Sequence, residues 1–185
     1  MGINTITYPI LSRYIDTDPV VLMGNLFMRR GVLKHYPGQS KYAALFIRAV
    51  HDVVTISMDI DPRHGGRAWD LGKPLVGWAA MFGVLFNGGT GEHIDDQAAF
   101  WRNCHRIVRP GGVMIHVVPL IGGWAGHSPW LYTRYFLRQL AQCNGYDVLE
   151  RIPFRAGRGE ALCMVLRHNG GGFNRVPWRH VKAGV

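Results

Sequence analysis

The chain has 185 residues, which suits one domain and allows a sizeable hydrophobic core. Its apolar share of 48% is ordinary for a globular protein, and no apolar run is long enough to span a membrane, so we expect no membrane partner. The net charge of +9 is the outlier: it indicates a nucleic acid, an acidic protein or an anionic substrate as partner, or only a solvated basic surface.

The chain is expected to consist of a lead-in, one domain and a tail. Residues 1–17 carry a short apolar patch and precede a break at Asp18-Pro19. The domain is predicted to span residues 18–168. Residues 169–185 are predicted to form a basic, glycine-rich tail, because three successive glycines are followed by several cationic side chains.

The first half of the domain is predicted to alternate strand and helix. Short runs rich in β-branched and apolar residues are typical of strands that are buried on both faces. The runs at residues 20–23 and 53–58 are each followed by polar or glycine residues, which are typical of the end of a strand. The expected elements are a strand over residues 20–23, a helix over 42–47 and a strand over 53–58.

The second half continues the alternation. Phe100, Cys104 and Ile107 recur at spacings of four and three, which places them on one face of a helix. Asn144-Gly145 is expected to end a later helix. The expected elements are strands over residues 81–86, 113–119, 147–152 and 161–166, and helices over 95–108 and 129–144.

This order predicts an α/β fold. Alternating strands and helices indicate a mostly parallel sheet with helices on both faces. Two strands follow the last helix, so we also expect an antiparallel edge pair near the C-terminus. In such sheets, ligands bind at the carboxyl ends of the strands.

The stretch from Asn87 to Ile94 carries the clearest chemical signal. Its three glycines predict a tight strand-to-helix turn that lets a ligand approach the backbone. Glu92 and His93 follow directly. A histidine can accept a proton near neutral pH, and a neighbouring carboxylate can orient it. The plainer alternative is a glutamate at a helix N-terminus and a histidine that packs against the sheet.

The chain resembles the Rossmann-like (class I) S-adenosylmethionine-dependent methyltransferases over roughly residues 18–167. It is most similar to a branch with the pattern N-x-G-T-x-E-H after the fourth strand. The order of several further motif residues supports the resemblance. The matching positions are Asn87, Gly89-Thr90, Glu92-His93, Gln97, His105, Pro110-Gly111-Gly112, Met114-Ile115-His116, Pro119, His127 and Asn144-Gly145-Tyr146.

The resemblance implies S-adenosylmethionine as cofactor and a set of residues that bind it. A carboxylate suits the ribose position because it can accept hydrogen bonds from both hydroxyls. By position in the family pattern, the turn at Gly24 and Asn25 would approach the methionine part, Asp59 the ribose, Asp70 and Leu71 the adenine, and Gly88, Gly89 and Thr90 the transferred methyl group.

Glu92, His93 and His127 are the candidate catalytic residues. His127 lies in a loop after the fifth strand, and such loops face the acceptor in this family. In the same region, Trp124 and Trp130 are candidates to frame a planar or apolar acceptor, or else to cover the edge of the core.

Two positions depart from the family pattern. Leu22 stands where the family has an acid before the first glycine, and Gly83 replaces an aspartate that often opens the fourth strand. We expect both changes on the cofactor side. Leu22 and the net charge of +9 together motivate an alternative to a methyltransferase with an unidentified acceptor, namely an inactive methyltransferase-like fold that serves as a basic binding or assembly module.

The cysteines indicate the redox state of the compartment and whether a zinc site is expected. Cys104, Cys143 and Cys163 are odd in number and show no CxxC spacing, so we expect reduced thiols, no zinc site and a cytoplasmic protein. His116 lies in an apolar strand, where we expect a core histidine that bonds to the backbone. A nicotinamide-dependent dehydrogenase is disfavoured, because the first turn lacks the pattern G-x-G-x-x-G.

Overall fold

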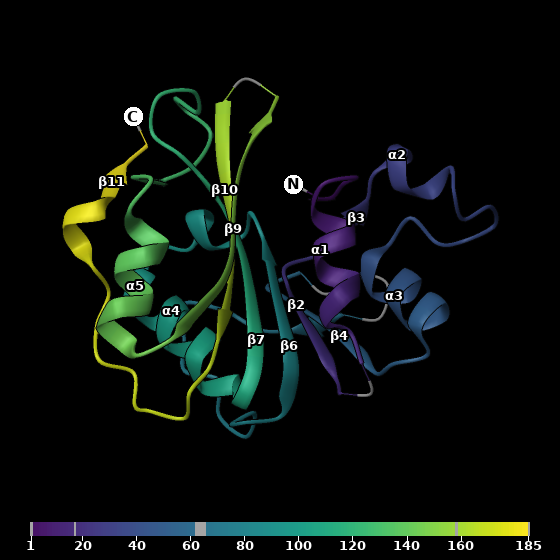
Figure 1. Cartoon of the computed structure of the whole chain (residues 1–185), viewed down its shortest axis with the longest axis horizontal. Coiled ribbons are helices and arrows are strands. Elements are labelled where there is room, and N and C mark those ends of the chain that lie inside the picture. Colours follow the sequence, from purple (N-terminus) through teal and green to yellow (C-terminus); the bar gives the residue numbers. More distant parts are fainter. Residues whose placement is uncertain (1, 17, 62–65, 158, 185) are drawn as a thin grey trace.

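The protein was analysed as a computed structural model, which describes residues 2–16, 18–61, 66–157 and 159–184. A seven-stranded sheet with the order β5-β4-β2-β6-β7-β10-β9 forms its centre (Figure 1). The first five strands run parallel, and β10 is antiparallel to both β7 and β9. The strands are β2 (Val20–Met23), β4 (Thr55–Asp59), β5 (Arg67–Ala68), β6 (Phe82–Gly88), β7 (Val108–Pro119), β9 (Asp147–Ala156) and β10 (Gly159–Arg167). The predicted fold class, with its antiparallel pair near the C-terminus, is confirmed.

Helices cover both faces of the sheet. On one side lie α1 (Thr7–Tyr14), α2 (Arg30–Leu33) and α3 (Ala43–His51), and on the other side lie α4 (Gln97–Ile107) and α5 (Phe136–Asn144) (Figure 1). Two short 3₁₀ turns, η1 (Gly91–His93) and η2 (Trp178–His180), complete the helical elements of the described residues. Within these residues, no helix combines the length and the apolar character that a membrane span requires.

The apolar run of β2 follows from this layering. Val20 and Leu22 are buried against the face that carries α1 and α3, whereas Val21 and Met23 are buried against the face that carries α4 and α5. Successive side chains of a strand point to opposite faces, so a strand covered on both faces must be apolar at every position. Leu22, at the position of the family's acid, is therefore a core residue of the α1 face.

Two short pairs of strands join the ends of the chain to this centre. β1 (Gly2–Ile3) pairs parallel with β3 (Phe27–Met28), and β8 (Trp130–Tyr132) pairs antiparallel with β11 (Val181–Ala183). Ile3 and Leu11 are fully buried in the core. The division of the chain into lead-in, domain and tail stays a prediction, but both end segments pack against the central layers.

The helix expected over residues 129–144 is wrong in its first part. Trp130–Tyr132 is strand β8, and α5 begins only at Phe136. The reason is tertiary: residues 181–183 supply the strand that pairs with β8, which local sequence does not show. The predicted end at Asn144-Gly145 is confirmed, since Gly145 caps α5 in the left-handed conformation with φ of 68°.

Strand β7 begins five residues earlier than expected. Arg109 to Gly112 continue the strand instead of forming a loop before it. The backbone N–H of Gly111 donates to the carbonyl of His168 at 2.6 Å, and the N–H of His168 donates to the carbonyl of Gly112 at 2.9 Å. The chain that leaves β10 thus supplies hydrogen-bond partners for these glycines.

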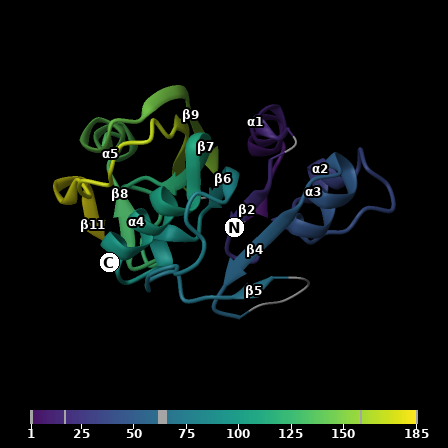
Figure 2. The ribbon, with the colours of Figure 1, turned by 90° about the horizontal axis from the view of Figure 1, so that it is seen from below.

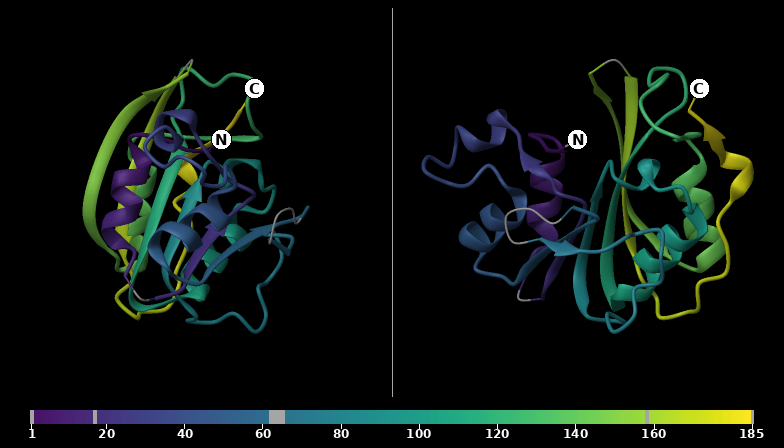
Figure 3. Two further views of the ribbon diagram at one scale, coloured as in Figure 1. Left: turned by 90° about the vertical axis from the view of Figure 1, so that its right-hand side faces the viewer. Right: turned by 180° about the vertical axis from the view of Figure 1, so that it is seen from behind.

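The carboxyl ends of the parallel strands β2, β4, β6 and β7 lie at one edge of the sheet, and several loops come together there. Figure 2 shows β4 and β5 side by side at one edge of the sheet. Figure 3 shows that the N-terminal segment and the loop between β7 and β8 lie toward the same end of the molecule, beside the tip of the β9–β10 hairpin. This is the end at which ligands bind in open parallel sheets.

Candidate active site

A cavity of about 620 Å³ opens at the carboxyl ends of β2, β4 and β6. We call it the first cavity. Its walls come from the turn after β2, the segment around β5 and the turn after β6. The lining residues are Asn25, Leu26, Asp59, Ile60, Trp69, Asp70, Leu71, Gly72, Lys73, Gly89, Thr90, His93, Ile94, Asp95 and Asp96.

Asp59 ends β4 and holds the turn after β2. Its Oδ2 accepts the backbone N–H of Asn25 at 2.7 Å, and its Oδ1 accepts that of Asp61 at 3.1 Å. The side-chain amide of Asn25 in turn donates to the carbonyl of Asp61. A carboxylate has about four acceptor positions, so Asp59 keeps capacity for further donors from a molecule in the cavity.

The turns after β2 and β6 are locked together by Gly24 and Thr90. Gly24 has φ of 92°, and a Cβ there would collide with the side chain of Thr90. The Thr90 hydroxyl donates to the carbonyl of Met23 at 2.6 Å. Asn87 supports the second turn, because its Oδ1 accepts the N–H groups of Thr90 at 3.1 Å and Gly91 at 3.2 Å. The glycine therefore permits a close approach of two backbone turns.

Asp70 and Leu71 form the far wall of the first cavity. Asp70 accepts the N–H of Gly72 at 2.9 Å and lies 3.4 Å from the Lys73 ammonium, so its carboxylate is partly engaged. Leu71 is buried and joins the core of the α4 face. Trp69, which no sequence pattern singled out, adds an aromatic ring to the same wall.

The cavity brings together six of the eight cofactor positions that the resemblance implies, namely Asn25, Asp59, Asp70, Leu71, Gly89 and Thr90. Gly24 lies behind the lining and shapes the turn, and Gly88 lines a different cavity. Sequence reasoning also missed Ile60 and Ile94. Their place in loops beside polar residues gave no signal.

A second cavity, of about 540 Å³, lies toward the N-terminal segment. We call it the second cavity. Segments far apart in the sequence form it: the start of the chain, the end of β3, the ends of β6 and β7, the loop before β8 and the tip of the β9–β10 hairpin. The lining residues are Gly2, Asn4, Thr5, Ile6, Thr7, Arg29, Phe86, Gly88, Val117, Trp124, His127, Phe154, Arg155, Ala156 and Gly157.

His93 and His127 link the two cavities. His93 lines the first cavity and His127 lines the second, and their ring centres are 5.1 Å apart. Burial lowers the pKa of both imidazoles below the ordinary value, and for His93 the nearby His127 lowers it further. Both rings are thus neutral near pH 7 and each has one nitrogen free to accept a proton.

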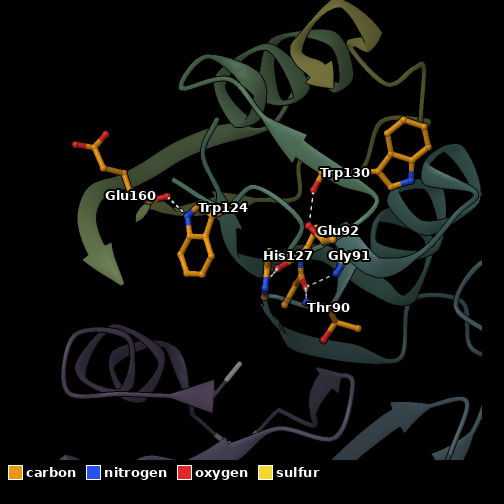
Figure 4. Close-up of polar contacts among 9 residues, drawn as sticks. Thr90, Gly91, Glu92, Trp124, His127, Trp130 and Glu160 are labelled. Atoms are coloured by element: carbon orange, nitrogen blue, oxygen red, sulfur yellow. Dashed lines mark hydrogen bonds and ion pairs between the residues drawn. The ribbon is translucent and has the colours of Figure 1, made fainter. Parts of the chain in front are cut away.

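Glu92 lies beneath this pair, in the 3₁₀ turn η1. Its side chain is fully buried, and neither carboxylate oxygen has a hydrogen-bond partner among the described residues. Burial raises the pKa of Glu92 from 4.5 to about 7. The carboxylate Oε1 lies 3.9 Å from His127 Nε2, which is longer than a hydrogen bond (Figure 4).

The spacing of the three groups bears on metal binding. One ligand atom each from Glu92, His93 and His127 lies within 4.8 Å of the others. Ligand atoms around a tetrahedral zinc ion are about 3.4 Å apart, as follows from bonds of about 2.0–2.1 Å. The three side chains place one carboxyl group and two imidazoles, all of which can exchange protons, within a short distance of one another.

Trp124 in the β7–β8 loop and Trp130 at the start of β8 differ in their surroundings. Trp124 lines the second cavity, and its ring is tilted against that of His127 with ring centres 4.9 Å apart. Its indole N–H donates to the Glu160 carbonyl at 2.7 Å (Figure 4). Trp130 is partly buried against the core of the α4 face. Only Trp124 is therefore placed to contact a molecule in the second cavity.

His116 is a core residue, as expected. It is buried between the sheet and α4, with its ring centre 4.9 Å from that of Trp101. Burial lowers the pKa of His116 to about 3, so the ring is neutral. The expected bond to the backbone is not found for Nδ1, which has no partner among the described residues.

The expectation that Gly83 lies on the cofactor side is wrong. Gly83 opens β6 at the amino end of the strand, opposite to the first cavity. A Cβ at Gly83 would collide with the side chain of Asp18, which forms an ion pair with Arg109. Asp18 thus fills the space beside this glycine, and the departure from the family pattern leaves the cavity unchanged.

Several solved structures of methyltransferases have the same architecture as this chain. A 1,6-didemethyltoxoflavin-N1-methyltransferase from Burkholderia thailandensis, solved with S-adenosylhomocysteine, matches with a TM-score of 0.61 and 16% identity over 87% of this chain and 76% of that one. The fold is that of the class I methyltransferases. The specific branch suggested by N-x-G-T-x-E-H stays a prediction.

Two further matches extend this result. A chain of the complex between the Haloferax volcanii Trm112 methyltransferase activator and its methyltransferase partner has a TM-score of 0.64 and 14% identity over 88% of both chains. A methyltransferase from Methanosarcina mazei has a TM-score of 0.58 and 12% identity over 88% of this chain and 98% of that one. No protein-family model and no curated protein matches the sequence.

Proposed function

We propose that the protein is an S-adenosylmethionine-dependent methyltransferase that binds the cofactor in the first cavity and the methyl acceptor in the second. The observation that carries this proposal is the junction of two cavities at His93, His127 and the buried Glu92. Methyl transfer needs two molecules that meet end to end with water excluded. Two cavities that open on either side of one turn provide this arrangement.

The first cavity fits the cofactor in its chemistry. Asp59 retains acceptor capacity for ribose hydroxyls, and Trp69, Leu71 and Ile60 supply an apolar wall for an adenine ring. The bound cofactor supplies a methyl group that is already activated for transfer, so the protein need only position the partners and manage one proton. Several structural neighbours are methyltransferases solved with the cofactor or its demethylated product, which supports this assignment.

His127 is proposed to take the proton from the acceptor. Its Nε2 faces Glu92, which leaves Nδ1 for the hydroxyl or amine that is methylated. The lowered pKa keeps the His127 ring neutral before transfer, and the ionised form of Glu92, whose pKa burial raises to about 7, can stabilise the imidazolium that forms. His93 adds a second neutral imidazole beside the path of the methyl group.

Calorimetry with S-adenosylhomocysteine and S-adenosylmethionine tests the proposal. We expect binding to the native protein and at least about a tenfold loss in Asp59→Ala, because hydrogen bonds to a charged group contribute about 1.5–3 kcal/mol each. Asp59→Asn keeps one acceptor oxygen, which can still hold the turn after β2. It therefore separates the loss of this turn from the loss of the charge that contacts the ribose. Asp147→Ala, at the exposed start of β9, is the matched control and should bind normally.

A native protein with no detectable heat and no thermal shift with either compound would overturn the proposal. It would favour the alternative, an inactive fold that binds a nucleic acid or an acidic protein. The dependence of nucleic-acid affinity on salt would then be the next measurement, because counterion release makes phosphate contacts weaken steeply as salt rises.

A further inference from the structure

The second cavity combines an apolar floor with cationic walls. Phe86, Val117 and Phe154 supply apolar surface, and Arg29 and Arg155 are the two cationic residues among those that line the cavity. No aspartate or glutamate is among the described residues that line it. Its lining therefore favours a molecule that has both an apolar body and negative charge.

The two arginines of this cavity have no anionic partner among the described residues. Neither Arg29 nor Arg155 makes an ion pair or a side-chain hydrogen bond with the described residues, whereas Arg13 pairs with Glu150 and Arg109 pairs with Asp18. A guanidinium presents a planar set of donors that matches a carboxylate or a phosphate. Arg29 and Arg155 are therefore available to an anion from outside the chain.

The acid nearest to Arg155 along the sheet does not neutralise it. Glu160 is the register partner of Arg155 in the β9–β10 pair, but no ion pair joins the two side chains in the described structure. Glu160 contacts Trp124 through its backbone carbonyl, and Figure 4 shows its carboxylate on the side away from the indole. Arg155 thus keeps its charge for the cavity.

The chain holds Arg29 beside the cavity through the β1–β3 pair. The N–H of Arg29 donates to the carbonyl of Ile3 at 2.9 Å, and Gly2 lies in register with Phe27. A Cβ at Gly2 would lie 3.2 Å from Nε of Arg29 and 2.5 Å from the Phe27 carbonyl oxygen. The missing side chain at Gly2 therefore makes room for both the strand pairing and the guanidinium.

Several other donors at this wall are already engaged within the chain. The first turn of α1 lines the cavity, but Asn4 Oδ1 accepts the N–H groups of Ile6 at 2.8 Å and Thr7 at 2.9 Å. The Trp124 indole donates to Glu160. Arg29 and Arg155 are the residues of this lining that combine donors with a permanent positive charge, as the recognition of an anion requires.

We propose that the methyl acceptor of this protein is an anionic small molecule, whose carboxylate or phosphate is held by Arg29 and Arg155 and whose apolar body lies on Phe86, Val117 and Phe154. This rests on the proposed function. A cavity of about 540 Å³ suits a small organic acid. The hydroxyl or amine of the acceptor then lies toward His127. The positive charge of the two arginines selects anionic acceptors over neutral ones.

Matched pairs of acids and neutral esters test this proposal. With saturating S-adenosylhomocysteine present, a panel of hydroxybenzoates and hydroxycinnamates is compared with the corresponding methyl esters, and phenyl phosphate is compared with phenol. The readout is the NMR signal of the Trp124 indole N–H, assigned with Trp124→Phe. We expect acids to bind at least about tenfold more tightly than esters, as a charge-assisted pair implies. The phosphate arm shows which anion is preferred.

Variants with matched controls localise the effect. Arg29→Ala and Arg155→Ala should each lose about tenfold in affinity for the acids. Arg30→Ala and Arg151→Ala remove neighbouring charges that do not line the cavity, and they should bind as the native protein does. Equal binding of acids and esters, failure of every acid to shift the indole signal, or full affinity in both cavity variants would overturn the proposal.

The cofactor titration separates this inference from the proposed function. S-adenosylhomocysteine that binds while the acids show no preference would refute the anionic acceptor and leave the methyltransferase standing. Acids that bind through Arg29 in a protein without affinity for S-adenosylhomocysteine would refute the methyltransferase and leave an anion-binding cavity.

Discussion

The two cavities differ in how the chain satisfies its polar groups. In the first, the carboxylates of Asp59, Asp70 and Asp96 each accept a backbone N–H, and the Thr90 hydroxyl donates to a carbonyl. In the second, Arg29 and Arg155 are unpaired among the described residues, and the buried carboxylate beneath it has no hydrogen-bond partner among them. One cavity is built by the fold itself, whereas the other presents groups that an outside molecule must satisfy.

This difference suggests a division of roles. A cavity formed by interlocked turns holds its shape without a ligand, which suits a cofactor that is the same in every catalytic cycle. Unpaired charges and a carboxylate with a perturbed pKa are costly to keep, and they concentrate where a protein recognises or transforms a substrate. The following variants and their controls test this division.

Gly24→Ala should have the largest effect, because it breaks the interlocked turns. The substitution places a side chain at φ of 92° and against Thr90. Strain and overpacking together should lower the free energy of unfolding by about 3 kcal/mol and abolish cofactor binding. Urea unfolding and calorimetry with S-adenosylhomocysteine measure the two effects.

Gly38→Ala is the matched control for backbone strain alone. Gly38 has φ of 80°, but a Cβ there would meet no atom within 4 Å. We expect a loss of about 1 kcal/mol and unchanged cofactor affinity. Equal losses in the two variants would show that the contact between Gly24 and Thr90 contributes nothing to the first cavity.

Glu92→Gln should change how stability depends on pH. A carboxyl group whose pKa rises from 4.5 to about 7 on folding stabilises the folded protein below pH 4.5, and this contribution is lost as pH rises through 7. The free energy of unfolding of the native protein, taken relative to that of Glu92→Gln, should therefore fall by about 3 kcal/mol between pH 4.5 and pH 8.

Chemical unfolding at several pH values measures this shift. Titrations of groups that do not contact Glu92 occur in both proteins and cancel in the difference, whereas His127, 3.9 Å from Glu92, is part of the measured effect. Glu160→Gln, at an exposed position, is the control and should leave the slope unchanged. A native protein that gains stability relative to Glu92→Gln as pH rises would mean that Glu92 is ionised and paired, and that its burial does not favour the neutral acid.

Arg109→Ala should have the smallest effect. It breaks the ion pair with Asp18 at the amino ends of the strands, where both side chains are partly exposed. Exposed ion pairs contribute about 0–1 kcal/mol, so we expect a loss below 1 kcal/mol and unchanged affinity for S-adenosylhomocysteine. A marked loss of affinity in calorimetry would show that the Gly83 end of the sheet does influence cofactor binding.

The sequence predicted the first cavity better than the second. The first is assembled from turns that directly follow parallel strands, so strand order alone brings Asn25, Asp59 and Thr90 to one edge. The second unites residues from both ends of the chain. No local motif marks Arg29 and Arg155, because the pairing of β1 with β3 and the reach of the β9–β10 hairpin cannot be read from local patterns.

Contacts between residues that are far apart in the chain could not be predicted from the sequence either. Gly83 looked like a loss at the cofactor site, but Asp18 occupies the volume beside it. Trp130–Tyr132 looked helical until the last residues of the chain supplied a strand partner. In both cases a long-range contact decided the outcome, whereas strands, helix ends and glycine turns followed from local chemistry.

The most direct test of the roles assigned to the two cavities is a crystal structure with S-adenosylhomocysteine. We predict density for the adenosine in the first cavity, with the ribose hydroxyls on Asp59, the adenine beside Leu71, and the sulfur directed past Thr90 toward His127. Binding in the second cavity, or a first cavity that closes and excludes the compound in crystals grown with an excess of it, would contradict this assignment.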